Sequence, residues 1–421
     1  MKTENPHNVQ CAKCGSCVPV CPIFQATGRE TLTARGRIHL LAKLTNPKTA
    51  EFGDILSKCL LCGACRNACP RGIDIPATII AARSNIKQFD KDSFKKKFIR
   101  QLLGSPILLK TITSITELAP NKAQLPAESG LNLRLAGLDL SITMPNKSFI
   151  DTQKNKSPTT LPKNSVLYFT GCLANHLSPG IASSSTTLLK KLCGLETFTP
   201  TQQGCCGMAS LSAGDYEKAI KVAKDNIDAF STGEIANLPI FTSCSTCYSA
   251  LRQYPELFKH DEFWKKKADQ FAQRLCEFSS FLLKNRQTDT LPTDHKPPGS
   301  SQQFFYHDPC HLRYGHPDGA APYPPITQQP RELLQTTTGI TPLELPNGPQ
   351  CCGQGGLFHI SHPELAAQVN DSLVNNVRQL NAKYIVTTCS GCLLQWKSAM
   401  TKTQPTSQCL HLAEFIECFP A

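Results

Sequence analysis

The chain has 421 residues and 22 cysteines, and 44 Lys and Arg against 32 Asp and Glu give it a formal net charge of +12. This length predicts about three domains and excludes the short secreted chains in which so many cysteines would form disulfides. The first residues, Met1-Lys2-Thr3, open no apolar signal segment, so we expect reduced thiols in a cytoplasmic protein. No apolar run is long enough to predict a membrane span.

The first segment carries two cysteine runs of the bacterial ferredoxin type. Each reads C-x2-C-x2-C-x3-C-P, at residues 11–22 and 59–70. Three closely spaced thiols can hold three corners of an iron-sulfur cube, and the fourth, before a proline, reaches the other cluster. We therefore predict two [4Fe-4S] cubane clusters. One is held by Cys11, Cys14, Cys17 and Cys69, and the other by Cys59, Cys62, Cys65 and Cys21.

Zinc is the alternative metal for such cysteines, but zinc sites use four ligands in pairs and do not explain eight thiols in this register.

The predicted clusters would also reduce the net positive charge of the chain. A cubane with four thiolate ligands carries a net charge of about −2, so several clusters would offset much of the excess. We therefore predict that the chain does not bind nucleic acid.

Helices are predicted between and after the two runs. Residues 36–44 have apolar positions at helical spacing, and residues 77–86 follow Pro76 at the start of another helical pattern. The first predicted domain, residues 1–92, is therefore a mainly helical dicluster ferredoxin domain.

A helical segment and a linker are predicted for residues 93–163. Residues 94–118 are basic and suit a solvated helix face, with docking to a partner or to anionic lipid as the alternative. Residues 120–163 are rich in Pro, Asn, Ser and Thr, which predicts a linker with little core of its own.

One five-residue stretch recurs in the rest of the chain. Gln203-Gly204-Cys205-Cys206-Gly207 returns as Pro349-Gln350-Cys351-Cys352-Gly353. A lone cysteine precedes each copy, and a C-x2-C pair follows it at nearly the same distance. The repeat predicts two copies of one five-thiol site. The first set is Cys172, Cys205, Cys206, Cys244 and Cys247, and the second is Cys310, Cys351, Cys352, Cys389 and Cys392.

Each copy is predicted to be an α/β module, at residues 164–284 and 303–421, with 285–302 as a polar linker. Strands that lead toward cysteines of these sets are predicted at 166–170, 240–243, 304–306 and 384–388, and helices at 172–192, 215–230 and 363–380. A proline-rich insert at 317–330 lengthens the second copy. Thiols at the carboxyl ends of parallel strands would meet helix N-termini, whose backbone donors favour anionic sulfur.

The alternative interpretation of each repeat is structural: a pair of buried thiols beside a zinc-binding C-x2-C pair. Iron-sulfur ligation is favoured, because the donors are all thiolates and the same chain carries a ferredoxin domain. Four cysteines lie outside these patterns and are predicted to be ordinary buried thiols: Cys193, Cys276, Cys409 and Cys418. His307 and His311 flank Cys310 and could donate hydrogen bonds to cluster sulfur or move protons.

The whole chain resembles the iron-sulfur subunit family of glycolate oxidase, with relatives in anaerobic glycerol-3-phosphate dehydrogenase, D-lactate dehydrogenase and heterodisulfide reductase systems. The resemblance depends on the two ferredoxin runs, on Ala34-Arg35-Gly36-Arg37-Ile38 between them and on the two Cys-Cys-Gly (CCG) modules. It implies that the five cysteines of each cysteine-rich module bind a noncubane [4Fe-4S] cluster, as they do in heterodisulfide reductases.

The function implied by this resemblance is an oxidoreductase role as an electron-transfer subunit. A separate flavin-binding subunit would oxidise a 2-hydroxyacid of the glycolate or D-lactate type, and this chain would pass the electrons singly to a quinone or another carrier. No nucleotide or flavin motif occurs in the sequence, so we expect no flavin in this chain. Peripheral attachment to the inner face of the cytoplasmic membrane stays open. The alternatives are disulfide reduction at the CCG clusters and a zinc-stabilised interaction protein.

Overall fold

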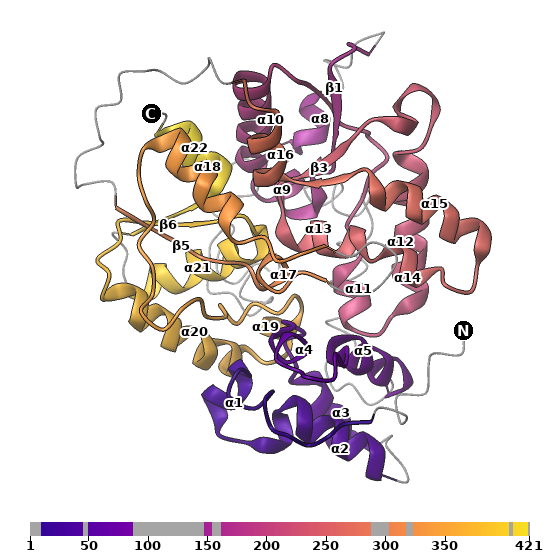
Figure 1. Cartoon of the computed structure of the whole chain (residues 1–421), viewed down its shortest axis with the longest axis vertical. Helices are drawn as coiled ribbons and strands as arrows, with labels where there is room; N and C mark the ends of the chain where they lie inside the picture. Colours follow the sequence, from indigo (N-terminus) through magenta and orange to yellow (C-terminus); the bar gives the residue numbers. More distant parts are fainter. Residues whose placement is uncertain are drawn as a thin grey trace, which may run out of the picture.

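The computed structural model describes residues 10–44, 49–86, 147–153, 161–287, 303–316, 323–403 and 407–419. The predicted basic helix at 94–118, most of the predicted linkers and the first part of the 317–330 insert lie outside these residues. Figure 1 shows the helical N-terminal part at one end of the molecule, with two sheet-containing modules lying side by side above it. Because the two sheets are parallel and the N-terminal part is helical, the predicted mixed multi-domain fold class is confirmed.

The N-terminal part, called here the helical domain, packs short helices around the two cysteine runs. Its elements are α1 (Pro22–Thr27), η2 (Glu30–Leu32), α2 (Ala34–Lys43), α3 (Ala50–Ser57), α4 (Ala64–Asn67) and α5 (Ile75–Ile86). Threonines cap two of them, because the side chain of Thr33 accepts from the amide of Gly36 and that of Thr49 from the amide of Phe52. Apolar faces of α2, α3 and α5 meet in a small core around Leu56. The helices predicted at 36–44 and 77–86 are present, whereas α3 was not predicted.

The first module is a four-stranded parallel sheet in the order β2-β1-β3-β4. Its strands are β1 (Ser165–Tyr168), β2 (Glu196–Phe198), β3 (Ile240–Thr242) and β4 (Leu275–Glu277). Its helices are α8 (Phe149–Gln153), α9 (Gly171–His176), α10 (Pro179–Cys193), α11 (Met208–Ser212), α12 (Tyr216–Ala229), η6 (Gly233–Asn237), α13 (Ser245–Arg252), α14 (Tyr254–Leu257), α15 (Glu262–Gln273) and α16 (Phe278–Asn285). β1 and β3 are fully buried, which matches their continuous apolar sequences.

Two expectations for the first module need correction. The single helix predicted at 172–192 is two helices, because Pro179 lacks a backbone donor and starts α10 after a break. The stretch predicted as a linker with little core contains α8, whose Phe149 is 2% exposed and packs edge-on against Tyr168 of β1. A short helix of this kind is stabilised by the core against which it packs and has little signal of its own.

The second module repeats this arrangement with a three-stranded parallel sheet in the order β5-β6-β7. Its strands are β5 (Phe304–Tyr306), β6 (Tyr384–Thr387) and β7 (Gln408–His411). Its helices are α17 (Cys310–Arg313), α18 (Gln328–Thr338), α19 (Phe358–Ser361), α20 (Pro363–Arg378), α21 (Ser390–Thr403) and α22 (Leu412–Cys418). A single parallel bridge between Phe305 and Leu343 lies where β2 pairs with β1 in the first module.

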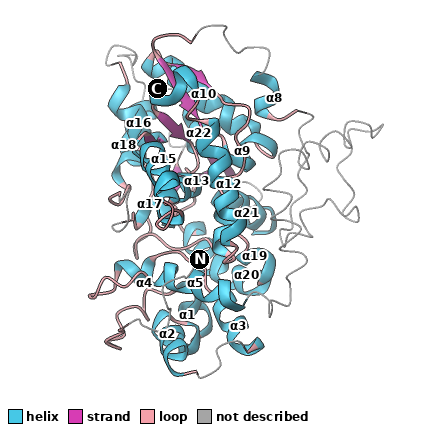
Figure 2. Ribbon diagram, turned by 90° about the vertical axis from the view of Figure 1, so that its right-hand side faces the viewer, coloured by secondary structure: helices cyan, strands magenta, loops and turns pink. Residues whose placement is uncertain are grey.

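The two modules meet at the carboxyl ends of β3 and β6. The amide of Ser245 donates to the carbonyl oxygen of Thr388 at 3.0 Å, and Nε2 of His411 lies 2.8 Å from the carbonyl oxygen of Ser243. The helical domain docks beneath both modules, and Figure 2 shows its helices at the end of the molecule away from the strands. Within the described ranges, no helix combines the length and apolar character that crossing a membrane requires.

Candidate metal centres

The structure gathers the eight ferredoxin cysteines into two sets of four, each lining its own cavity. The outer cavity is lined by Cys11, Cys14, Cys17 and Cys69. The inner cavity is lined by Cys21, Cys59, Cys62 and Cys65. These are the two ligand sets predicted from the exchange of the fourth cysteine between the runs. Cys14 is exposed, so the outer cavity lies close to solvent.

Two arginines of the Ala-Arg-Gly-Arg-Ile phrase hold the loops around these cavities. Arg37 is 2% exposed and donates to the carbonyl oxygens of Ile55 at 3.0 Å and Lys58 at 2.7 Å, just before Cys59. Arg35 lines the outer cavity and donates to the carbonyl oxygen of Lys13 at 3.3 Å. Each arginine therefore orders the backbone of one cysteine run and places a positive charge beside a thiol set.

The ten cysteines of the two modules line one common cavity of about 260 Å³, called here the central cavity. The cysteines of the first module are Cys172, Cys205, Cys206, Cys244 and Cys247, and those of the second are Cys310, Cys351, Cys352, Cys389 and Cys392. The sequence predicted two copies of a site, but not that both would open into the same space. Cys62 of the helical domain also lines this cavity, so the inner and central cavities share a wall.

The parallel sheets explain why the cysteines converge. Cys172 follows β1 and Cys244 follows β3, and these neighbouring strands have β2 and β4 on their outer sides. Connections from β1 and β3 therefore leave in different directions and open a crevice at their carboxyl ends. Cys244 is the N-cap residue of α13. Free amides at a helix N-terminus favour an anionic sulfur at this position.

The two Cys-Cys-Gly turns have the same backbone geometry. Gly207 and Gly353 have φ of +82° and +79°, a region that only glycine enters without strain. Their amides point at the preceding cysteines, 3.5 Å from Sγ of Cys205 and 3.4 Å from Sγ of Cys351. An asparagine holds each turn in place, since Nδ2 of Asn226 donates to the carbonyl oxygen of Cys205 at 2.8 Å, and Asn370 does so to Cys352 at 3.0 Å.

The burial and crowding of these thiols indicate that a positively charged group binds among them. Burial raises the pKa of Cys62 and Cys310 well above the usual thiol value, and each lies close enough to another thiol for repulsion to raise it further. In the first module, hydrogen bonds from Cys172 and Cys206 lower the pKa of Cys205. Crowded buried thiolates are stable only beside positive charge, which an iron-sulfur core supplies in thiolate-only surroundings. The donor set of the central cavity therefore fits multi-iron clusters.

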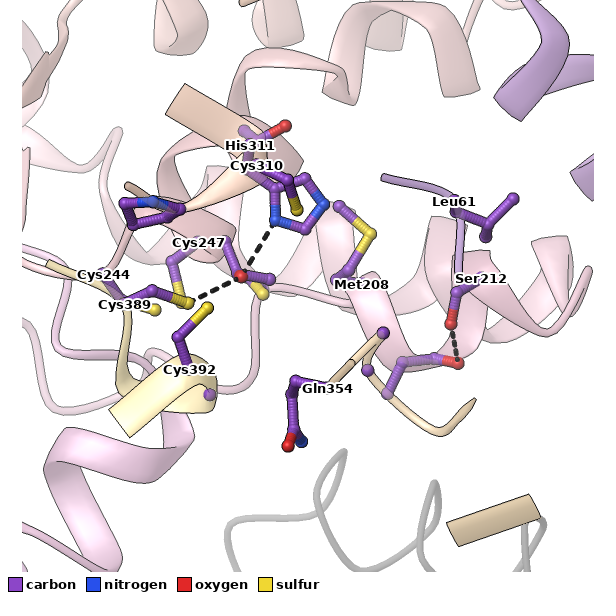
Figure 3. Close-up of a pocket in the computed structure, with 18 of the residues that line it drawn as sticks. Leu61, Met208, Ser212, Cys244, Cys247, Cys310, His311, Gln354, Cys389 and Cys392 are labelled. Atoms are coloured by element: carbon purple, nitrogen blue, oxygen red, sulfur yellow. Dashed lines mark hydrogen bonds between the residues drawn. The ribbon is translucent and has the colours of Figure 1, made fainter. Parts of the chain in front are cut away.

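Side chains of the second module and of α13 add hydrogen bonds near these thiols, as Figure 3 shows around His311. Oγ1 of Thr246 lies 3.0 Å from Nδ1 of His311 and 3.2 Å from Sγ of Cys389. His307 is 2% exposed, and its ring lies within 4.8 Å of the sulfurs of Cys352 and Cys392. Burial lowers the pKa of His311 to about 4, which keeps its ring neutral.

The remaining cysteines line none of the three cavities: Cys193, Cys276, Cys409 and Cys418. Cys193 and Cys409 are buried and Cys276 partly so, but Cys418 is exposed, which contradicts the prediction of a buried thiol there. Sequence reasoning also missed Thr246 and Arg66, which line the central cavity. Only the position of Thr246 inside the C-x2-C pair could have indicated a role.

Comparison with known proteins agrees with this arrangement. The family described as a 4Fe-4S dicluster domain matches residues 8–73, and the family described as a cysteine-rich domain matches residues 166–252 and 304–397. Fold and sites together define an iron-sulfur protein with one dicluster domain and two cysteine-rich domains.

Three relatives place the chain more closely. The probable glycolate oxidase iron-sulfur subunit of Bacillus subtilis is 29% identical over 97% of this chain and 93% of its own length. The glycolate oxidase iron-sulfur subunit of Escherichia coli is 25% identical over 92% of this chain and 89% of its own length. Lactate utilization protein A of Bacillus pumilus is 27% identical over 59% of this chain and 97% of its own length. The chain is similar to the glycolate oxidase iron-sulfur subunits over most of its length, which confirms the resemblance seen in the sequence.

A solved structure shares the fold. The crystal structure of a hypothetical protein from Helicobacter pylori matches with a TM-score of 0.53 over 98% of this chain and 73% of that chain, at 8% identity. At this identity the match bears on the fold alone.

Proposed function

We propose that this chain is the iron-sulfur electron-transfer subunit of a flavin-dependent 2-hydroxyacid dehydrogenase, and so the oxidoreductase component that moves electrons away from the flavin. The names of its relatives, glycolate oxidase iron-sulfur subunit and lactate utilization protein A, support a glycolate or lactate type of substrate for the complex. The substrate itself would be oxidised on a flavin-binding partner subunit. The final acceptor would be a quinone or another electron carrier.

The continuity of the three cavities carries this proposal. Ile75 lines both the outer and the inner cavity, and Leu60 and Cys62 line both the inner and the central cavity. The series begins near solvent at Cys14 and ends among the ten thiols between the two modules. The shared lining residues Ile75 and Leu60 are apolar, which suits the transfer of electrons and not of a diffusing substrate.

The cysteines of each cavity are the proposed ligands. The outer and inner sets of four would each hold a cubane [4Fe-4S] cluster, and each module would hold a further noncubane [4Fe-4S] cluster through its five thiols. Such clusters supply one-electron redox couples, which a two-electron flavin needs to release its electrons singly. We place the assembly in the cytoplasm, with peripheral attachment to the inner face of the membrane as the way to reach a quinone.

Anaerobic purification with iron and sulfide analysis and low-temperature EPR tests the ligand assignment. About sixteen iron atoms per chain are expected for four clusters. About eight iron atoms with zinc bound to both modules would overturn the assignment in the cysteine-rich part. Mixing the chain with its reduced flavin subunit then tests the relay, since the cubane signals should appear in a single turnover of the flavin.

A second candidate function is reduction of a disulfide in the central cavity. It is favoured by one observation: the thiol sets of the two modules face one space, and side chains such as Leu211 and Leu394 add apolar walls to it. An apolar disulfide could therefore lie between the two sets. Turnover of a heterodisulfide by the isolated chain with a reduced dye would support this function, and absence of turnover in cluster-loaded chain would exclude it.

A further inference from the structure

The two thiol sets of the central cavity have equivalent cysteines, but the side chains that can donate hydrogen bonds to them differ. From this difference we propose that Thr246 and His307 raise the reduction potential of the cluster held by the second module above that of the first. The proposal depends on the proposed function, because it assumes that both modules hold clusters.

Thr246 reaches across the boundary between the modules. It belongs to α13 of the first module, yet its hydroxyl lies 3.2 Å from Sγ of Cys389 in the second module. The same hydroxyl lies 3.0 Å from Nδ1 of His311. A ligating thiolate can only accept, so the hydroxyl hydrogen points at Cys389 and Nδ1–H of His311 donates to the hydroxyl oxygen. His311 thus positions Thr246 as a donor to the second thiol set.

His307 contacts the same thiol set from the other side. A nitrogen of its ring lies within 4.8 Å of the sulfurs of Cys352 and Cys392, so that a ring N–H can donate to the second thiol set. The ring is 2% exposed and packs edge-on against Trp396, with ring centroids 5.6 Å apart. Packing therefore holds the imidazole against the sulfurs, where water cannot replace it.

The two positions that would serve the first thiol set in the same way carry no side-chain donor. Within the C-x2-C pairs, Thr246 precedes Cys247 as Gly391 precedes Cys392. On the strands before the lone cysteines, His307 follows Tyr306 as Phe169 follows Tyr168. The equivalence of these positions is supported by the tyrosines, because each hydrogen-bonds the residue before the first cysteine of its C-x2-C pair: Tyr168 bonds Ser243 at 2.7 Å and Tyr306 bonds Thr388 at 3.2 Å.

Hydrogen bonds to cluster sulfur raise a reduction potential, because they stabilise the additional negative charge of the reduced state. The second thiol set also lies next to the helical domain, since Cys62 is close enough to Cys310 and Cys351 for their charges to interact. The centre of the second module is thus the one beside the inner cavity and the one that retains an electron more strongly. An electron that leaves the helical domain is therefore expected to reside there.

Potentiometric titration of the full, cluster-loaded chain, followed by EPR, tests the proposal. Thr246→Val keeps the shape of the side chain and removes the hydroxyl. It should lower the potential of one cysteine-rich centre so that the electron is held about tenfold less strongly there, which is about 59 mV for a one-electron couple. His307→Phe, which copies the first module, should lower the potential of the same centre. Thr246→Ser keeps the hydroxyl and should leave the potential near that of the unmodified chain.

Gly391→Thr provides the reciprocal test. A Cβ at this position would lie 3.6 Å from Cγ of Gln354 and 3.8 Å from Sγ of Cys389, which are ordinary contacts, so the variant should fold. The added hydroxyl should raise the potential of the first module's centre. The difference in potential between the two centres should therefore become smaller. Thr336→Val, at a partly exposed position of α18 that lines none of the three cavities, is the matched control and should shift neither centre.

The outcomes separate this inference from the function on which it depends. If iron analysis and EPR show both cysteine-rich centres but Thr246→Val and His307→Phe leave their potentials unchanged, the inference is overturned and the relay stands. If the modules hold no iron-sulfur cluster, the proposed function fails first. If the two variants shift different centres, the assignment of both donors to one cluster is wrong.

Discussion

Arg83 of α5 donates through Nη1 to the carbonyl oxygen of Ser212 in α11 at 2.6 Å, and this bond joins the helical domain to the first module. The same guanidinium donates to the carbonyl oxygens of Leu56 and Cys59 at 2.8 Å and 2.7 Å. One side chain therefore fixes both the loop that enters the second cysteine run and the interface with the cysteine-rich part. The interface is close, because a Cβ on Gly214 would come within 2.5 Å of the amide nitrogen of Ser84.

The first prediction concerns this interface. Arg83→Met keeps the length of the side chain but removes the hydrogen bonds that the guanidinium makes to partly buried carbonyl groups, which should destabilise the fold by about 2–3 kcal/mol. Urea unfolding measures this loss. Electron transfer from the helical domain to the central cavity should also slow, which stopped-flow reduction can follow. Arg29→Met, at an exposed arginine of the same domain, is the control. Unchanged stability and transfer rate would show that Arg83 does not join the two parts.

The second prediction concerns the loop before Cys310. Arg331 of α18 binds Asp308 through two nitrogens, at 2.8 Å and 2.6 Å, and the carboxylate of Asp308 is 3% exposed. Arg331→Met leaves this buried charge without its partner, so we expect a loss of about 3–5 kcal/mol in the free energy of unfolding. Adding Asp308→Asn should recover part of the loss, because the uncompensated charge is then removed. Additive losses in the double variant would contradict this coupling.

The third prediction compares the two Cys-Cys-Gly turns. A Cβ on Gly353 would lie 2.6 Å from the carbonyl oxygen of Ala366, whereas the nearest atom to a Cβ on Gly207 would be 3.5 Å away. Both positions have positive φ, so each Gly→Ala variant should lose about 1–2 kcal/mol from backbone strain. Gly353→Ala should lose more than Gly207→Ala and should reduce iron content in the second module. Equal losses in the two variants, measured by urea unfolding and iron analysis, would show that helix α20 moves away without cost.

The fourth prediction concerns the buried thiols that line no cavity. Burial raises the pKa of Cys193 to about 11 and that of Cys409 to about 12. In the unfolded chain these thiols ionise near pH 8.5, so between about pH 8.5 and 11 the unfolded state loses protons that the folded state keeps. Stability conferred by the two neutral thiols is therefore fully present below pH 8.5 and falls as the pH rises.

Cys193→Ala and Cys409→Ala should each flatten this alkaline decline, which urea unfolding at a series of pH values measures. Cys418→Ala is the matched control, because Cys418 is exposed. Both buried-site variants should also retain the full iron content of the chain. Loss of iron from either one would make that cysteine a ligand, against its position outside the three cavities.

Local features were predictable because short-range spacing fixes them. The C-x2-C-x2-C-x3-C-P runs brought four thiols to each of two cavities, and strands were expected at 166–170 and 384–388 because both stretches are apolar and run directly into a cysteine. The sequence pattern could not show α8, since Phe149 is stabilised by the core of the first module and not by its neighbours in the chain.

The sequence by itself determined the kinds of sites: two ferredoxin thiol sets, a duplicated five-thiol set and the α/β units that carry it. Only the tertiary structure decided how these parts meet. It opened both five-thiol sets into one cavity, placed Cys62 in its wall and put Thr246 of one module against Cys389 of the other. The physical reason is that cysteine spacing encodes a local turn, whereas the docking of two sheets depends on side chains far apart in the chain, such as the pair Ser243 and His411.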